Sequence, residues 1–151
     1  MLPAHDWVPS YNLALTTANR LYAPGAGGKL WTKDDADAAG GTLQSVVFYG
    51  FNSYNASPAA FDATIFINTP ITVDALGNVF FGFIATGANP AGLASGIARI
   101  GANGVGTWVS AAVAAADPGV AKVAMNSAPA LSADLATLYV AVNNGSAGTT
   151  Q

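Results

Sequence analysis

The sequence contains no cysteine and no glutamate, and it has a single histidine. Without cysteine the chain cannot form disulfides, use a thiol nucleophile or hold a metal through thiolates. Charged residues make up only 9% of the 151 residues, and the formal net charge at pH 7 is −3. The five Lys and Arg residues are scattered, so the chain lacks the basic stripe that nucleic-acid binding requires. We therefore expect neither thiol chemistry nor a nucleic-acid partner.

Long hydrophobic runs are also missing, although 52% of the residues are hydrophobic. No run reaches the roughly 18 apolar residues of a membrane-spanning helix, so we expect no membrane span. The first residues, from Met1 to Trp7, lack the basic and apolar regions of a signal peptide. Two alternatives stay open here: a cytosolic chain, or a chain whose native start lies elsewhere. Because residues that favour exposed helices are scarce, helix should be a minor component.

What the sequence does contain is a pattern that recurs about every 59 residues: a short apolar strand, a polar turn and a strand with an aromatic residue. The copies are 12–22, 70–80 and 129–139. Their anchors, Leu21, Val79 and Leu138, are 58 and 59 positions apart. A fixed period of this length indicates a repeat architecture. We divide the single domain 1–151 into repeats of approximately 8–60, 61–120 and 121–151, the last incomplete.

The second repeat shows the expected strands most clearly. They are 64–68, 71–73, 78–84, 95–100 and 105–111. Asp74 and Gly77 bound one polar turn, and Asn103-Gly104 is a strong hairpin signal. Only 109–116 has helical character. The sequence therefore predicts an all-β fold of consecutive four-stranded antiparallel blades, which is a partial β-propeller.

Two segments carry a family resemblance. Thr69-Pro-Ile-Thr-Val-Asp-Ala-Leu-Gly-Asn-Val-Phe80 and Asn126-Ser-Ala-Pro-Ala-Leu-Ser-Ala-Asp134, the latter followed by 137–140, resemble the blade-opening strands of bacterial propellers with pyrroloquinoline-quinone-like (quinoprotein-like) repeats. The resemblance implies an extracellular or periplasmic bacterial protein, often a binding or scaffold propeller. Gly28-Lys29-Leu30-Trp31 is similar to the tryptophan-docking pattern of these repeats, whereas 104–108 lacks the lysine.

Catalytic residues are hard to find in this sequence. His5 is the only histidine and a natural general base, but no partner for it can be identified. A structural or solvent-exposed histidine is the simpler interpretation. No Gly-x-Ser-x-Gly motif occurs, so we assign neither a catalytic residue nor a cofactor-binding residue.

The acidic cluster Asp34, Asp35 and Asp37 lies in a glycine-bounded segment. Carboxylates at this spacing can share Ca²⁺, which takes six to eight oxygen ligands. Counted from Asp35, however, the fifth loop position is Ala39 and the twelfth is Val46 in place of glutamate. A solvated loop is the favoured interpretation, and a calcium loop is the alternative.

Two functions remain from the sequence. The favoured one is a non-catalytic extracytoplasmic propeller module that binds a protein or glycan or acts as a scaffold. The alternative is a part of a quinoprotein-type dehydrogenase that binds pyrroloquinoline quinone and calcium. An isolated stretch of blades exposes sheet faces and edges that natural proteins usually cover. We therefore expect a fragment of a longer protein whose remaining blades cover these surfaces, or self-association of the chain.

Overall fold

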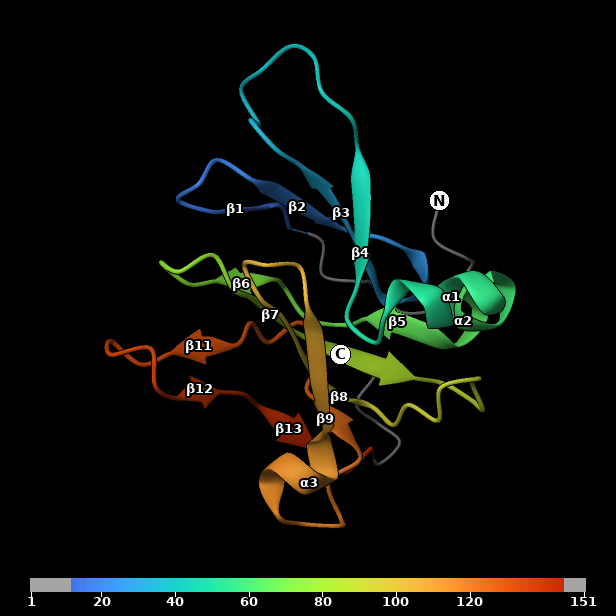
Figure 1. Ribbon diagram of the computed structural model, residues 1–151. Helices are drawn as coiled ribbons and strands as arrows, with labels where there is room; N and C mark the ends of the chain where they lie inside the picture. Colours follow the sequence, from blue (N-terminus) through green and yellow to red (C-terminus); the bar gives the residue numbers. More distant parts are fainter. Residues whose placement is uncertain (1–11, 146–151) are drawn as a thin grey trace.

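The computed structural model describes residues 12–145, which form antiparallel sheets and a few short helices (Figure 1). The prediction of an all-β fold is confirmed. Within these residues no helix is long and apolar enough to cross a membrane. His5 and the first residues of the expected first repeat lie outside the described part of the chain.

The first sheet is an antiparallel meander of four strands in chain order. Its strands are β1 (Ala14–Leu15), β2 (Leu21–Pro24), β3 (Lys29–Lys33) and β4 (Gln44–Val47). The short 3₁₀ turn η1 (Ala26–Gly28) joins β2 to β3. In the part of the chain that the structure describes, β4 pairs with β3 alone, so β4 forms one edge of this sheet.

The second sheet repeats the meander with an interrupted first strand. Its strands are β5 (Ile65–Ile67), β6 (Thr72–Val73), β7 (Val79–Ala85), β8 (Gly96–Ile100) and β9 (Gly106–Ser110). β5 and β6 both pair with β7, one after the other along its length. Between them lies Pro70, which has no N–H to donate to a ladder and therefore suits a strand break.

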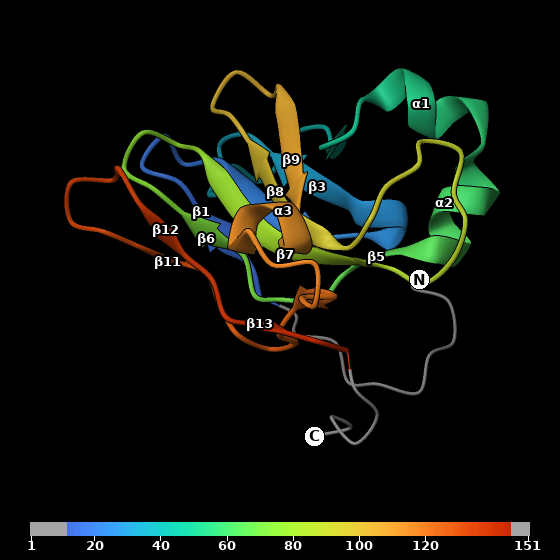
Figure 2. The same cartoon turned by 90° about the horizontal axis from the view of Figure 1, so that it is seen from below.

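The first and second sheets are the first two units of the chain. The third unit is a hairpin of two interrupted strands. β10 (Lys122–Val123) pairs with β13 (Val142–Asn143), and β11 (Ala130–Leu131) pairs with β12 (Leu138–Tyr139). The β1–β2, β6–β7 and β11–β12 hairpins lie side by side in chain order, as two perpendicular views show (Figures 1 and 2).

The three anchor residues occupy equivalent positions in these hairpins. Each is the first residue of its strand and pairs with an apolar residue of the preceding strand. The pairs are Leu15 with Leu21, Val73 with Val79, and Leu131 with Leu138. The repeat in the sequence is therefore a repeat of pairing register.

The turns of the three hairpins are stabilised in the same way. A side-chain oxygen of Thr16, Asp74 or Ser132 accepts a hydrogen bond from the backbone at the far side of its own turn. The donors are the N–H groups of Arg20, Asn78 and Thr137, at 3.1, 2.8 and 2.9 Å. Such short polar side chains hold turns because they replace backbone partners.

Two of the three short α-helices found in residues 12–145 were not expected from the sequence. α1 (Phe51–Ala56) and α2 (Pro58–Thr64) lie between the first and second sheets in the chain, and each buries one aromatic residue, Tyr54 or Phe61. α3 (Ala111–Ala115) lies in the segment for which helical character was predicted, and the Ser110 side chain caps its N-terminus. α2 begins at Pro58, and proline is favoured at the first position of a helix.

The hydrophobic core lies mainly between the first and second sheets. The first sheet and the residue that follows it contribute Tyr22, Leu30, Val47 and Phe48, and the second sheet contributes Ile67, Val79, Phe81, Phe83 and Ile100, all at most 5% exposed. Phe48 makes an edge-on contact with Phe81, with ring centroids 5.8 Å apart. This packing holds the residue after β4 against β7 of the second sheet.

Candidate functional site

Two adjoining cavities of about 460 Å³ each lie between β4 and the β8–β9 hairpin. Both are lined by Ser45, Val46 and Gly104, so we treat them as one groove. We call it the β4 groove. Its other lining residues are Arg20, Tyr22, Thr32, Gln44, Val47, Phe48, Tyr49, Gly50, Phe51, Ala102, Asn103, Val105, Gly106 and Trp108.

The groove runs along an edge of the first sheet. Every residue from Gln44 to Val47 lines it, although successive side chains of a strand point to opposite faces. A strand that contributes consecutive residues to a cavity presents its backbone edge there. Among the described residues, β4 has no strand partner other than β3. The groove therefore offers the hydrogen-bonding groups of an open strand edge.

One end of the β4 groove is apolar and aromatic. Trp108 is 38% exposed, Phe51 46% and Val105 59%. The Trp108 ring packs edge-on against the buried Phe83, with centroids 5.9 Å apart. A half-buried and well-supported indole of this kind is a typical anchor for a bound partner.

The other end of the groove is polar. Arg20 lies there and donates a hydrogen bond from Nε to Asp34. This bond, followed by one with Tyr22, raises the pKa of Arg20 above its ordinary value, so the guanidinium stays charged. Asn103 accepts a hydrogen bond from the Val105 N–H at 3.1 Å, which fixes the β8–β9 turn. The groove thus combines an aromatic anchor with fixed polar groups.

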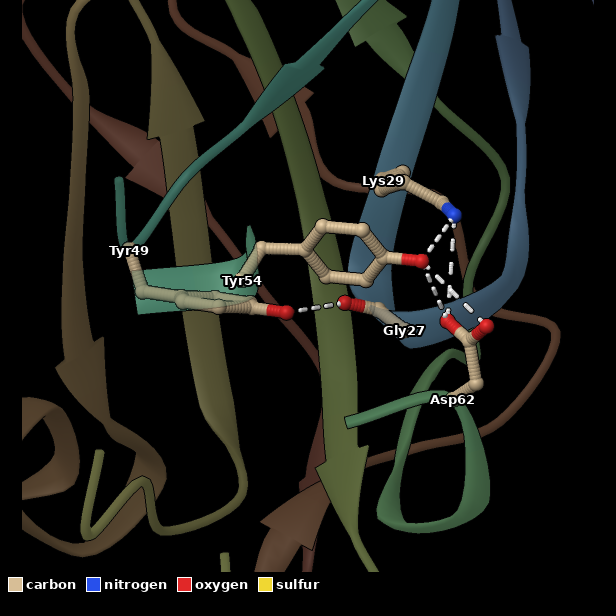
Figure 3. Close-up of polar contacts among 5 residues, drawn as sticks. All are labelled: Gly27, Lys29, Tyr49, Tyr54 and Asp62. Carbon is tan, nitrogen blue, oxygen red and sulfur yellow. Dashed lines mark hydrogen bonds and ion pairs between the residues drawn. The ribbon is translucent and has the colours of Figure 1, made fainter. Parts of the chain in front are cut away.

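A polar cluster of Lys29, Tyr54 and Asp62 lies near Tyr49, which lines the groove (Figure 3). The Lys29 ammonium group donates a hydrogen bond to the Tyr54 hydroxyl and lies 3.8 Å from Asp62 Oδ1. Tyr54 donates to the Asp62 carboxylate, with oxygen–oxygen distances of 3.1 and 3.2 Å. The Lys29 nitrogen also lies 4.2 Å from the centre of the Tyr54 ring. These three groups satisfy one another, and the cluster clamps β3, α1 and α2 together.

Tyr49 joins this clamp to the groove. Its hydroxyl donates to the Gly27 carbonyl at 2.6 Å (Figure 3). Its ring also stacks on Phe61, with centroids 4.5 Å apart. Burial, followed by electrostatic interaction with Tyr54 and Asp62, raises the pKa of Tyr49 well above its ordinary value. The neutral hydroxyl is therefore held as a donor. Because Tyr49 also lines the groove, this contact positions the groove wall.

The predicted acidic cluster lies in the connection between β3 and β4. Asp34 bonds to Arg20, and Asp37 accepts from the Asn19 side chain at 3.1 Å. The φ of Asp35 is 48°, a left-handed backbone conformation that is typical of turns. In residues 12–145 no group of three acidic or histidine side chains is arranged to hold a metal. The calcium loop stays a prediction, and His5 is outside the described residues.

The groove and the clamp were not found from the sequence. Lys29 and Tyr54 are 25 positions apart, and no short motif joins them. The Gly28-Lys29-Leu30-Trp31 segment drew attention to Lys29, but for a different role. Lys29 lies 5.7 Å from the Trp31 ring centre, so these two residues do form a local contact.

Comparison with protein-family models, with curated proteins and with solved structures finds no match to this chain. The resemblance to quinoprotein-like repeats therefore rests on the sequence segments 28–31, 69–80 and 126–140.

Proposed function

We propose that this chain is a non-catalytic, extracytoplasmic binding module with partial β-propeller architecture, and that the β4 groove is its ligand site. The observation that carries the proposal is the groove itself, with a supported Trp108 beside the open edge of β4. Grooves that combine aromatic anchors with a few fixed polar groups commonly bind ligands. The extracellular or periplasmic location rests on the family resemblance.

The chemistry of the groove favours a protein ligand. An extended polypeptide segment can add a strand to an open sheet edge, where main-chain hydrogen bonds supply affinity and side-chain pockets supply specificity. Gln44, Ser45 and Val46 present such an edge, and Trp108 and Phe51 can take an apolar side chain. A glycan is the other outcome that the test below distinguishes.

The partial propeller is supported by the side-by-side order of the three hairpins (Figure 1). Neighbouring units are joined by hydrogen bonds between positions about one repeat apart: Asn12 to Ile71, Thr17 to Ala75, and Thr72 to Pro129. In a propeller each blade covers the next one. On this proposal, remaining blades or another copy of the chain cover the faces at both ends of the row.

The ligand site is tested with the purified chain on a library of extended peptides and on a glycan array. Trp108→Ala removes the anchor, and Trp31→Ala is the matched control because both indoles are 38% exposed and Trp31 does not line the β4 groove. We expect peptide ligands whose affinity falls by about tenfold or more with Trp108→Ala only. If the chain binds glycans and no peptides, the ligand is a glycan and not a protein. Peptide affinity that is unchanged by Trp108→Ala would contradict the assignment of the β4 groove as the ligand site.

A further inference from the structure

Within residues 12–145, the three hairpin units form a row that ends in two exposed surfaces. The head face is the surface of the first sheet turned away from the second sheet, and it carries Leu13, Leu15, Leu21 and Trp31. The tail face is the outward surface of the β11–β12 hairpin, and it carries Ala130 and Tyr139. Leu13, Leu15 and Tyr139 are 64%, 52% and 61% exposed. Both faces thus expose large apolar side chains.

The interface between the first two units shows how such faces are covered inside the chain. Ala14 and Tyr22 are a cross-strand pair that faces the second unit, and they are 7% and 1% exposed. Ile71 and Val79 of the second unit belong to the same core cluster, at 5% and 0% exposed, and Val73 packs against that cluster. An alanine–tyrosine pair on one unit is therefore packed against aliphatic residues of the next.

The tail face carries the same alanine–tyrosine pair that the first unit contributes to this interface. Ala130 pairs with Tyr139 in the register in which Ala14 pairs with Tyr22, so the side chains are of identical type. Tyr22 is 1% exposed, whereas Tyr139 is 61% exposed. Phe80 of the second unit, at the equivalent position, is half-buried next to the third unit. The difference between these positions follows from the presence or absence of a covering neighbour.

The head face carries counterparts of the aliphatic residues that the second unit contributes to the interface between the first two units. By the register of the hairpins, Leu15 and Leu21 correspond to Val73 and Val79. Leu13, two residues before Leu15, corresponds to Ile71, which is 5% exposed against 64% for Leu13. Each aliphatic residue that packs onto the Ala14–Tyr22 pair therefore has an aliphatic counterpart on the head face.

We propose that the tail face of one copy of this chain binds the head face of a second copy and so continues the internal packing of the row. The proposal rests on the partial-propeller part of the proposed function. The contact joins two different surfaces, so it is head-to-tail. Contacts of this kind close into rings when the rotation between copies permits and otherwise extend as filaments.

Sedimentation velocity of the purified chain over a wide concentration range tests the contact. We expect the average mass to rise above that of the monomer as concentration increases. Leu15→Lys damages the head face and Tyr139→Lys the tail face, and each is expected to weaken association by about 30-fold or more. Leu76→Lys is the matched control: Leu76 is 68% exposed on a turn outside both faces, and its substitution is expected to leave association unchanged.

Mixing the two damaged variants gives the decisive result. The Leu15→Lys chain keeps an intact tail face and the Tyr139→Lys chain keeps an intact head face, so an equimolar mixture should form a one-to-one dimer that grows no further. Circular dichroism confirms that each variant is folded. A wild-type monomer at all concentrations, or a mixture that does not associate, would overturn the contact. Peptide binding through Trp108 that persists in such a monomer would leave the ligand site standing.

Discussion

Gly106 begins β9 and lies directly against the backbone of Phe48, the residue that follows β4. A methyl group at this position would lie 2.2 Å from the carbonyl oxygen of Phe48 and 2.3 Å from its Cα. Both are backbone atoms, so no side-chain rotation can relieve the contact and β4 and β9 must move apart. Overpacking of a close-packed interior costs about 1–3 kcal/mol and sometimes more. We expect Gly106→Ala to lower the free energy of unfolding by about 3 kcal/mol, because the atoms it meets are backbone atoms.

Urea unfolding followed by tryptophan fluorescence measures this loss, with two other glycines as controls. Gly104 has a positive φ of 80° and nothing within 4 Å of an added methyl group, so Gly104→Ala should cost only the backbone strain, about 1 kcal/mol. Gly40 has open space and no positive φ, so Gly40→Ala should stay within about 0.5 kcal/mol of the wild type. If Gly106→Ala were no worse than Gly104→Ala, the close approach of β4 and β9 would be refuted.

Three further predictions concern the repeat, the clamp and the groove wall. Tyr22→Ala should lower the free energy of unfolding by about 3–5 kcal/mol and Tyr139→Ala by less than about 0.5 kcal/mol; equal losses in urea unfolding would contradict the covering role of the second unit. Lys29→Met should cost about 1–2 kcal/mol, because Asp62 loses its cation and a hydrogen-bond network is broken, and an unchanged urea midpoint would argue against the clamp. Because Tyr49 keeps its proton in the folded state while the unfolded chain loses it, stability should fall as pH rises above about 10. The decline should be shallower in Tyr49→Phe when unfolding is measured from pH 9 upward, and an identical decline would refute the raised pKa.

The local turn chemistry could be predicted from the sequence because it depends on neighbouring residues. Asp74 does bound a turn, accepting hydrogen bonds from the N–H groups of Leu76 and Asn78, and Gly77 has a positive φ of 83°. The Asn103-Gly104 turn joins β8 to β9 as its composition indicated. In both cases one side chain and one glycine determine the path of the backbone.

The helices α1 and α2 could not be predicted in the same way. Their segment, 51–64, carries Asp62 as its one charged residue and lacks the Lys, Arg and Glu that favour exposed helices. Its stability comes from burying Tyr54 and Phe61 against distant parts of the chain. The close approach of Phe48 to Gly106 joins residues 58 positions apart. Contacts of this kind determine where the groove lies, and nothing in the local sequence reports them.

The groove arises where the repeats differ from one another. The β1–β2, β6–β7 and β11–β12 hairpins share their register and turn bonds, so they build the row. β4 is followed by α1 and α2, whereas β9 is followed by α3, and the clamp of Lys29, Tyr54 and Asp62 belongs only to the first unit. In repeat proteins, insertions into single repeats often form the binding face. A variant of the clamp should therefore change the groove and leave the row of hairpins intact, because the groove and the hairpins depend on different residues.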